Sequence, residues 1–344
     1  MPSSASPPRT PPTRSARSST TRRPRPTVWS STDMLPAPSF HHLHLNSVDP
    51  ESAIDFYTRH FACSSRTEWG GEPALATAND VLILFTKVDA PPATAPETAI
   101  WHFGWHVTDA RASLARYRQA PGLKLLPLYT SETGESVLIS SDAWPGVDGV
   151  LGRTRAQLVE ARTSGVKPKG GAGFAYMQGP DGALVEYAGD HPAERFNHVH
   201  LWQDNPFCAQ LWYQKHLNAQ PMEGRTSPVA MDESNCRVPR GPEPTWPSLD
   251  LQGTYRVPRA AVMFGDVALT WYPRQGDGPL ASPRGHVCDH IGLGVADLDA
   301  WTRKLSGEGI AIVEGPYRVG NTRAVMIEGP SRELLELIEV PERG

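Results

Sequence analysis

The 344-residue sequence has few cysteines, a small net charge and no long apolar run, and each of these features excludes a class of protein. Its four cysteines lie far apart without a CxxC pair, which indicates a reduced compartment and thiols that pack as small apolar groups, with a disulfide left open. The formal net charge of −4 gives no basic surface for nucleic acid or for membrane lipid. No apolar run approaches the roughly 20 residues of a membrane span. We therefore expect a cytoplasmic protein that binds neither nucleic acid nor membrane.

The first 38 residues have almost nothing to bury. They consist mainly of Ser, Thr, Pro and Arg, and Asp33 is the only acid among them. Such a composition cannot offset the entropy lost on folding, so we predict a disordered tail over residues 1–38. The frequent prolines argue against an amphipathic transit peptide, and a start of translation at Met34 is the alternative.

A strand-like segment that contains histidine occurs four times in the rest of the chain. Apolar and polar residues alternate in each copy, which is typical of a half-buried strand. After the first copy, Asp49 and Pro50 open a helix whose apolar residues share one face. Short strands follow, so the chain is read as four βαβββ-like units. The opening segments are 40–46, 101–107, 197–202 and 289–295.

The order of these units predicts an α+β fold of two domains. The first and second units would pair within residues 39–192, and the third and fourth within residues 193–344. Internal repetition of this kind constrains the whole fold at once, because equivalent segments must adopt equivalent structures.

Matched positions of the four units carry side chains that bind metals. With the units paired in chain order, the first domain would use His42, His102 and Glu186. Two neutral imidazoles and one carboxylate leave positions open on the cation, as in non-haem Fe(II) sites. We therefore expect a divalent metal, Fe(II) first, with Mn, Zn and Ni as alternatives. The matching set in the second domain is His198, His290 and Glu336.

Other polar residues accompany these ligands. His44 and His106 share a strand face with the predicted ligands, so they are candidate acid–base groups, and His200 is the counterpart of His44. The alternative for these histidines is that they are polar residues at the mouth of the cup. Tyr176 is a candidate substrate-facing hydroxyl, with packing as its alternative. The second ligand set also has an alternative, since Glu336 could be a surface carboxylate in a degenerate unit.

The four units resemble the vicinal oxygen chelate superfamily, which includes glyoxalase I, extradiol dioxygenases, fosfomycin-resistance proteins and methylmalonyl-CoA epimerase. The matching motifs are the H-x-x-L and H-x-G-L opening strands, the helix with Phe56-Tyr57, and Gly179-Pro180-Asp181-Gly182-x-x-x-Glu186. The resemblance implies paired βαβββ modules that form open, cup-shaped sheets around a divalent metal. Neighbouring oxygens of a small-molecule substrate would bind that metal.

The resemblance also bears on the reaction. Glyoxalase I and the epimerase take a further Glu or Gln ligand from the last strand of the first unit, where this chain has Ile83 and, in its second half, Leu269. Neither side chain binds a metal, so the resemblance implies an extradiol-dioxygenase-like enzyme. However, the histidine that precedes Tyr176 in the dioxygenase signature is missing. A glyoxalase, lyase or isomerase and a non-catalytic drug- or antibiotic-binding protein are therefore the alternatives, and a homodimer is left open.

Overall fold

The computed structural model describes residues 35–126, 129–130, 137–138, 163–165, 174–189, 191–238, 259–274 and 279–341. Residues 35–344 form one compact unit. Residues 1–34, which are most of the predicted disordered tail, lie outside the described residues.

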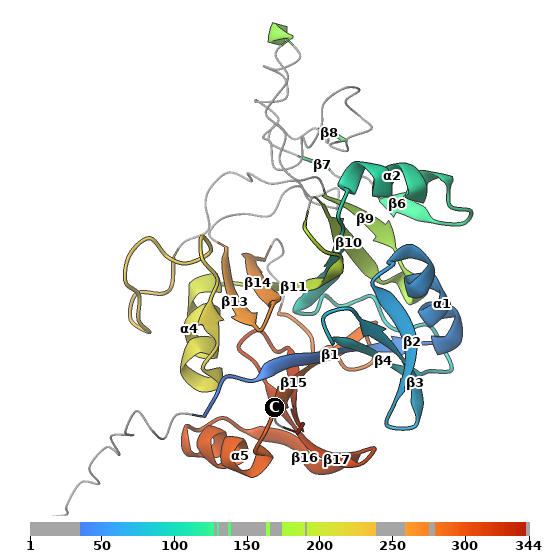
Figure 1. The fold of residues 1–344 in the computed structure, drawn as a ribbon. Coiled ribbons are helices and arrows are strands. Elements are labelled where there is room, and N and C mark those ends of the chain that lie inside the picture. Colours follow the sequence, from blue (N-terminus) through green and yellow to red (C-terminus); the bar gives the residue numbers. More distant parts are fainter. Residues whose placement is uncertain are drawn as a thin grey trace, which may run out of the picture. The chain divides into compact units, whose positions relative to one another are not determined.

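The first eight-stranded sheet, sheet I, combines strands of the first and fourth units (Figure 1). Its central strand β1 pairs antiparallel with β15 and parallel with β4, and β15 pairs parallel with β18. In spatial order the strands are β16 (Ile312–Val319), β17 (Thr322–Glu328), β18 (Leu334–Glu339), β15 (Cys288–Val295), β1 (Ser39–Ser47), β4 (Leu82–Lys87), β3 (Glu72–Thr77) and β2 (Ser64–Trp69).

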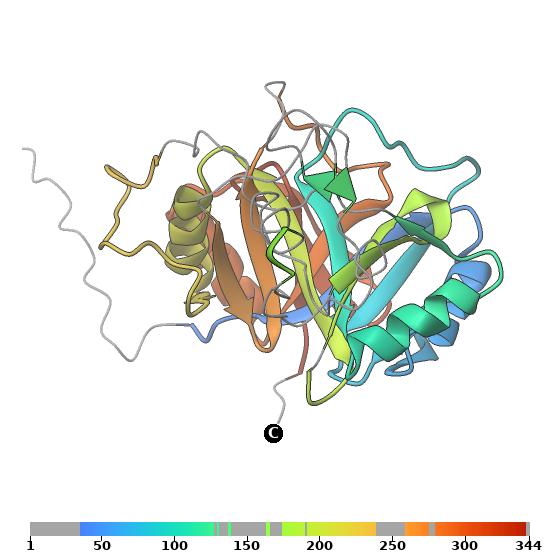
Figure 2. The same cartoon turned by 90° about the horizontal axis from the view of Figure 1, so that it is seen from above.

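The second eight-stranded sheet, sheet II, combines the second and third units in the same way. Figure 2 shows its two central strands, β5 and β11, side by side, and they pair antiparallel. In spatial order the strands are β12 (Gln220–Pro221), β13 (Ala260–Phe264), β14 (Val267–Pro273), β11 (Arg195–Gln203), β5 (Ile100–His106), β10 (Leu184–Ala188), β9 (Phe174–Gln178) and β6 (Lys124–Leu126). A separate two-stranded ladder joins β7 (Tyr129–Thr130) to β8 (Val137–Leu138).

The α+β class and the four paired units are therefore confirmed, but the predicted pairing by chain order is wrong. Each sheet takes one unit from residues 39–192 and one from residues 193–344. The opening strand of each unit carries unpaired backbone groups along one edge, and any other opening strand can satisfy them. In this fold β1 satisfies them with β15, and β5 with β11.

The helices join units that follow one another in the chain. As predicted, Asp49 caps α1 (Pro50–His60) by accepting a hydrogen bond from the Ser52 amide. From α2 (Ala110–Gln119), the Tyr117 hydroxyl donates to the His60 carbonyl of α1 at 2.8 Å. A similar contact joins α4 (Pro206–Leu217) to Glu308, the C-cap residue of α5 (Leu298–Gly307), with 2.8 Å between His216 Nδ1 and a Glu308 carboxylate oxygen.

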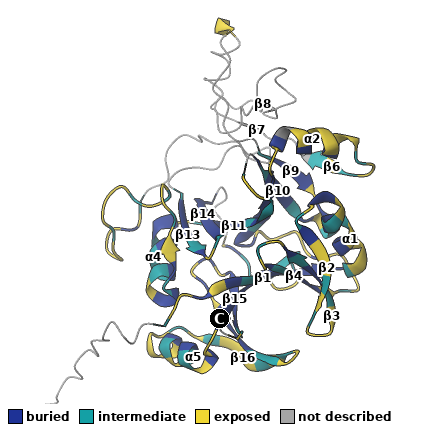
Figure 3. Ribbon diagram, viewed as in Figure 1, coloured by how far each residue is buried: buried dark blue, intermediate teal, exposed yellow. Residues whose placement is uncertain are grey.

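One hydrophobic core runs through both sheets and keeps the central strands β1, β15 and β11 largely buried (Figure 3). The cysteine prediction holds only in part, because Cys208 and Cys236 form a disulfide, whereas Cys63 and Cys288 are free thiols. Sequence distance hid this pair, since α4 and the loop after β12 come together only in the folded chain. Within the described part of the chain, no helix has the length and apolar character needed to cross a bilayer.

Candidate metal centres

Both sheets place a His-x-His strand opposite a His-x-Gly strand. In sheet I, His42 lies opposite Gly292, and His44 lies opposite His290. In sheet II, the same ladder sets His198 against Gly104 and His200 against His102. Because alternate residues of a strand share one face, each ladder gathers three imidazoles on a single face.

The two glycines leave the space that the facing imidazoles occupy. A Cβ built on Gly292 would lie 2.0 Å from Cε1 of His42, and one on Gly104 would lie 2.7 Å from Cε1 of His198. No other residue would leave this room, because every other side chain begins with a Cβ atom.

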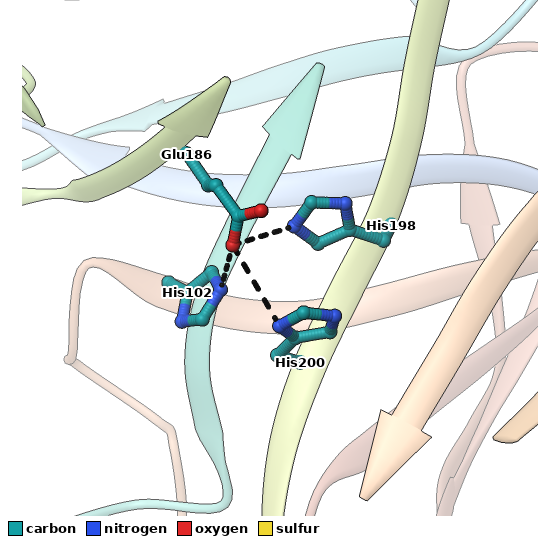
Figure 4. Close-up of side chains that lie close together, drawn as sticks. All are labelled: His102, Glu186, His198 and His200. Atoms are coloured by element: carbon teal, nitrogen blue, oxygen red, sulfur yellow. Dashed lines mark hydrogen bonds and ion pairs between the residues drawn. The ribbon is translucent and has the colours of Figure 1, made fainter. Parts of the chain in front are cut away.

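Centre II, in sheet II, consists of His102, His198, His200 and Glu186. Figure 4 shows the three rings directed at one carboxylate oxygen, Oε2 of Glu186. This oxygen lies 2.9 Å from His102 Nε2, 3.4 Å from His198 Nε2 and 3.9 Å from His200 Nδ1. All four side chains are buried, and their four donor atoms lie within 4.8 Å of one another.

The pKa shifts of His102, His200 and Glu186 favour the forms that bind a metal. Burial lowers the pKa of His102 to about 4, although Glu186 partly opposes the shift. Burial also lowers the pKa of His200, and His198 and His102 add to the effect. Burial acts against the Glu186 carboxylate, but His198 and His102 outweigh it and hold the pKa of Glu186 below its usual value. Neutral imidazoles and an ionised carboxylate are the forms that bind a cation.

Two ring nitrogens of centre II fit a cation closely. His198 Nε2 and His200 Nδ1 are buried and have no hydrogen-bond partner, although both face Glu186. An unsatisfied polar atom in the interior costs free energy, and a metal ion among these donors would satisfy both nitrogens.

Centre I, in sheet I, consists of His42, His44, His290 and Glu336. His42 Nε2 lies 3.4 Å from His290 Nε2 and 3.5 Å from Glu336 Oε2. Glu336 is only 4% exposed, which contradicts the alternative that it is a surface carboxylate. The turn before Glu336 differs in backbone from that of the second unit, since Arg332 has a φ of 67° whereas Asp181 and Gly182 have 56° and 81°. Both turns are nevertheless closed by the same 2.8 Å hydrogen bond, from Gly329 N to the Glu333 carbonyl and from Gly179 N to the Ala183 carbonyl.

Neighbouring groups orient the ligands of centre I. Asp289 Oδ1 lies 2.8 Å from His290 Nδ1, and Arg284 and Asn46 hold Asp289 in turn. The Tyr317 hydroxyl donates to Glu336 Oε1 at 2.7 Å, which leaves Oε2 facing His42. Such outer contacts fix the tautomer and the direction of metal ligands.

Burial sets the protonation of centre I as well. It lowers the pKa of His42 far below its usual value, and it lowers the pKa of His44 to about 3 with a further contribution from His290. Burial raises the pKa of Glu336, and His290 and the Tyr317 hydroxyl oppose this shift. A bound cation would oppose it further, since a nearby positive charge favours the carboxylate.

A cavity of about 380 Å³ opens beside centre I. Most of the residues that line it are polar or charged, so it can hold a small ligand that carries oxygen atoms. Three residues of the centre line the cavity, namely His44, His290 and Glu336. The rest of the lining is Asn46, Leu84, Thr86, Arg284, Asp289, Glu314, Tyr317, Arg318, Val319 and Met326.

All six predicted ligands lie in these two centres, but in different combinations. His42 shares its centre with His290 and Glu336, rather than with the predicted partners His102 and Glu186. The predicted set His198, His290 and Glu336 is divided in the same way, because the pairing by chain order was wrong.

The three supporting residues differ in position. His44 belongs to centre I, and Tyr176 lies beside centre II with its ring 5.0 Å from the His102 ring. His106 instead stacks on His191 at 4.2 Å and is not one of the four donors gathered at centre II. From the sequence we predicted only a supporting role for His200, although the His-x-His pattern shared by the first and third units could have indicated its place in the cluster.

In the structure, the position from which a further carboxylate ligand would reach each centre lies one residue later than the sequence predicted. Ile83 and Leu269 are fully buried in the core. The strand register places Leu84 beside His44 and Thr270 beside His200. Leu84 cannot bind a metal, and the Thr270 hydroxyl accepts a hydrogen bond from Arg225 at 3.0 Å. The conclusion that no Glu or Gln stands here is therefore unchanged.

Known proteins share this architecture. The fold is similar to that of glyoxalase I from Zea mays, with 16% identity and a TM-score of 0.56 over 88% of this chain and 92% of that chain. It is also similar to a provisionally assigned dioxygenase from Bacillus subtilis subsp. subtilis str. 168, with 11% identity and a TM-score of 0.52 over 90% of this chain and 87% of that chain. A comparison with curated protein sequences gave no match.

A family match covers the third and fourth units. Residues 195–337 match the family described as Glyoxalase/Bleomycin resistance protein/Dioxygenase superfamily. The first and second units repeat the same strand order in the two sheets. Residues 195–337 therefore belong to this superfamily by their sequence, and the four units of the chain share its fold as two sheets with a candidate metal centre in each.

Proposed function

We propose that the protein is a divalent-metal-dependent enzyme that acts on a small organic substrate through two neighbouring oxygen atoms, with extradiol-dioxygenase-like chemistry at centre I. One observation carries this proposal: the buried set His42, His290 and Glu336 lies beside a cavity of about 380 Å³, whose wall includes His290 and Glu336. When bound, a metal would supply Lewis acidity and, as Fe(II), access to dioxygen chemistry.

The residues around the cavity have separate tasks in this proposal. Asp289 accepts from the Nδ1–H of His290, so that Nε2 keeps its lone pair for the metal. The Tyr317 hydroxyl holds Glu336 so that one oxygen stays directed at His42. These contacts hold the donors in place before the metal arrives, which lowers the ordering cost of binding.

His44 is the candidate group for proton transfer. It lines the cavity, and its Nε2 lies 2.7 Å from the Thr86 hydroxyl. Because burial lowers its pKa to about 3, the ring is neutral but weakly basic, and it could accept a proton only from a substrate hydroxyl that a bound metal would acidify. Arg284 and Arg318 also line the cavity and would attract anionic groups of a substrate.

Metal analysis and a ring-cleavage assay test the proposal. Protein reconstituted anaerobically with Fe(II) should bind the metal and cleave a catechol in the presence of dioxygen. The double variant His42→Ala, His290→Ala should lose cleavage at centre I and one equivalent of metal, whereas Arg318→Ala should keep the metal. Methylglyoxal with glutathione is the contrasting substrate, and turnover of it alone would favour the glyoxalase alternative. Less than about half an equivalent of any transition metal would favour a non-catalytic binding protein.

A further inference from the structure

We propose that centre II holds its metal with four side chains, His102, His198, His200 and Glu186, whereas centre I uses three, so that the two centres support different reactions. The proposal rests on the proposed metal-dependent function of both centres. It assigns a ligand role to His200, and it denies that role to His44, which occupies the same position in the repeat.

His200 has the position and the free nitrogen of a ligand. It is 8% exposed, its Nδ1 lacks a hydrogen-bond partner, and this atom lies 3.9 Å from Glu186 Oε2. Its ring stacks on His198 at 4.1 Å and meets His102 at 4.5 Å. The four donor atoms of centre II therefore converge, and a cation among them would satisfy a nitrogen that is otherwise buried without a partner.

His44 is engaged differently at the matching position. Its Nε2 is hydrogen-bonded to the Thr86 hydroxyl at 2.7 Å, and its ring stacks on His290 at 4.4 Å. Within the described chain, donor atoms of His42, His44 and His290 lie within 4.8 Å of one another at centre I, and Glu336 Oε2 contacts His42 Nε2 at 3.5 Å without joining that group. Four donors thus do not meet at one point in centre I, as they do in centre II.

One substitution between the repeats explains this difference. Thr86 follows Leu84 by two residues, and Tyr272 follows Thr270 by two, so the strand register makes Thr86 and Tyr272 equivalent. Thr86 offers a hydroxyl to His44, whereas Tyr272 packs its ring against His200 with centroids 5.0 Å apart. The aromatic contact positions the His200 ring and leaves Nδ1 for a metal.

The number of protein ligands limits what else can bind. A six-coordinate ion keeps three open positions with three protein ligands and two with four. A chelating substrate fills two positions, so dioxygen can join it at centre I but not at centre II. Centre II would then suit reactions without a second molecule on the metal, such as an isomerisation in which a proton leaves one carbon of the substrate and returns to another.

Copper(II) alone serves as the probe, because pulsed electron paramagnetic resonance counts the imidazoles bound to it. The full-length double variant His290→Ala, Glu336→Ala keeps only centre II, and His102→Ala, Glu186→Ala keeps only centre I. We expect three coordinated imidazoles in the first protein and two in the second.

Single changes in these backgrounds then test each histidine. At centre II, His200→Ala should reduce the count to two and raise the dissociation constant for copper at least about tenfold. At centre I, the matched change His44→Ala should leave the count at two and alter the dissociation constant less than about threefold. If His200→Ala fails to fold by circular dichroism, His200→Asn replaces it with a side chain closer in size.

The outcomes separate the two proposals. Equal imidazole counts in the two double variants would overturn the unequal coordination, and so would an unchanged count after the loss of His200. If folded wild-type protein binds no copper, nickel, zinc or iron at either centre, the proposed function itself fails. Copper binding with equal counts would leave that function standing.

Discussion

His42 and Gly292 form a complementary pair across the central ladder of sheet I. A Cβ on Gly292 would lie 2.0 Å from Cε1 and 2.1 Å from Nδ1 of His42, so the imidazole occupies the room that the glycine leaves. The same relationship links His198 with Gly104 in sheet II. The metal centre and the pairing of the units are therefore coupled, because the histidine comes from one unit and its space comes from another.

The substitution Gly292→Ala should displace the His42 imidazole and abolish metal binding at centre I. We expect one equivalent less of bound metal and a loss of about 1–3 kcal/mol in the free energy of unfolding, since the added methyl overfills a packed site. Metal analysis and chemical denaturation measure the two effects. Gly307→Ala is the matched control, because a Cβ there meets nothing within 4 Å. Full metal content in the Gly292 variant would contradict the steric argument.

Pairs of histidine substitutions test which units share a centre. His42→Ala combined with His290→Ala removes two ligands of one centre, so about one equivalent of metal should remain. His42→Ala combined with His102→Ala damages both centres and should leave almost none. Pairing by chain order would give the opposite result, which makes metal stoichiometry by atomic emission decisive.

Glu333 should make the stability of the fold depend on pH. The residue is fully buried, the Tyr213 hydroxyl donates to it at 2.7 Å, and burial raises its pKa to about 7. Since the folded protein favours the protonated form, its stabilising contribution is complete below the unfolded pKa of about 4.5 and is lost as the pH rises through about 7. The lost stability is on the order of 3 kcal/mol.

Glu333→Gln tests this prediction, because the amide keeps the size of the side chain and does not titrate. The free energy of unfolding should fall between pH 5 and pH 8 by more in the wild type than in this variant. Exposed Glu223→Gln provides the control and should follow the wild type. Parallel pH profiles for all three proteins would show that Glu333 does not carry the effect.

The disulfide between Cys208 and Cys236 should stabilise the region around α4. It links residues 28 positions apart, and closing a loop of that length contributes about 3.6 kcal/mol in the chain-entropy account. Dithiothreitol should therefore lower the unfolding midpoint of the wild type but not that of Cys208→Ser, Cys236→Ser. Alkylation of the unfolded, unreduced protein should label two thiols, and labelling of all four would disprove the bond.

Much of the local structure could be predicted from the sequence. The alternation around His42 indicates a strand, and Asp49 with Pro50 marks the start of a helix; both features are local and depend on residues close in the chain. Repetition also singled out His42, His102, His198 and His290 and the closing carboxylates as candidate ligands, and their binding of metal stays a prediction. The strands that carry them are confirmed, because equivalent segments of the four units repeat the same short-range pattern.

The sequence by itself determined that four similar units exist, which strand face carries each histidine, and where the glutamate-bearing strands close the second and fourth units. Only the tertiary structure decided that β1 pairs with β15 and β5 with β11, and hence which His and Glu residues meet. The physical reason is that the edges of the opening strands present the same backbone hydrogen-bonding groups, so the repeat pattern does not distinguish their partners. The choice depends on contacts between residues far apart in the chain, such as the imidazole of His42 and the space at Gly292.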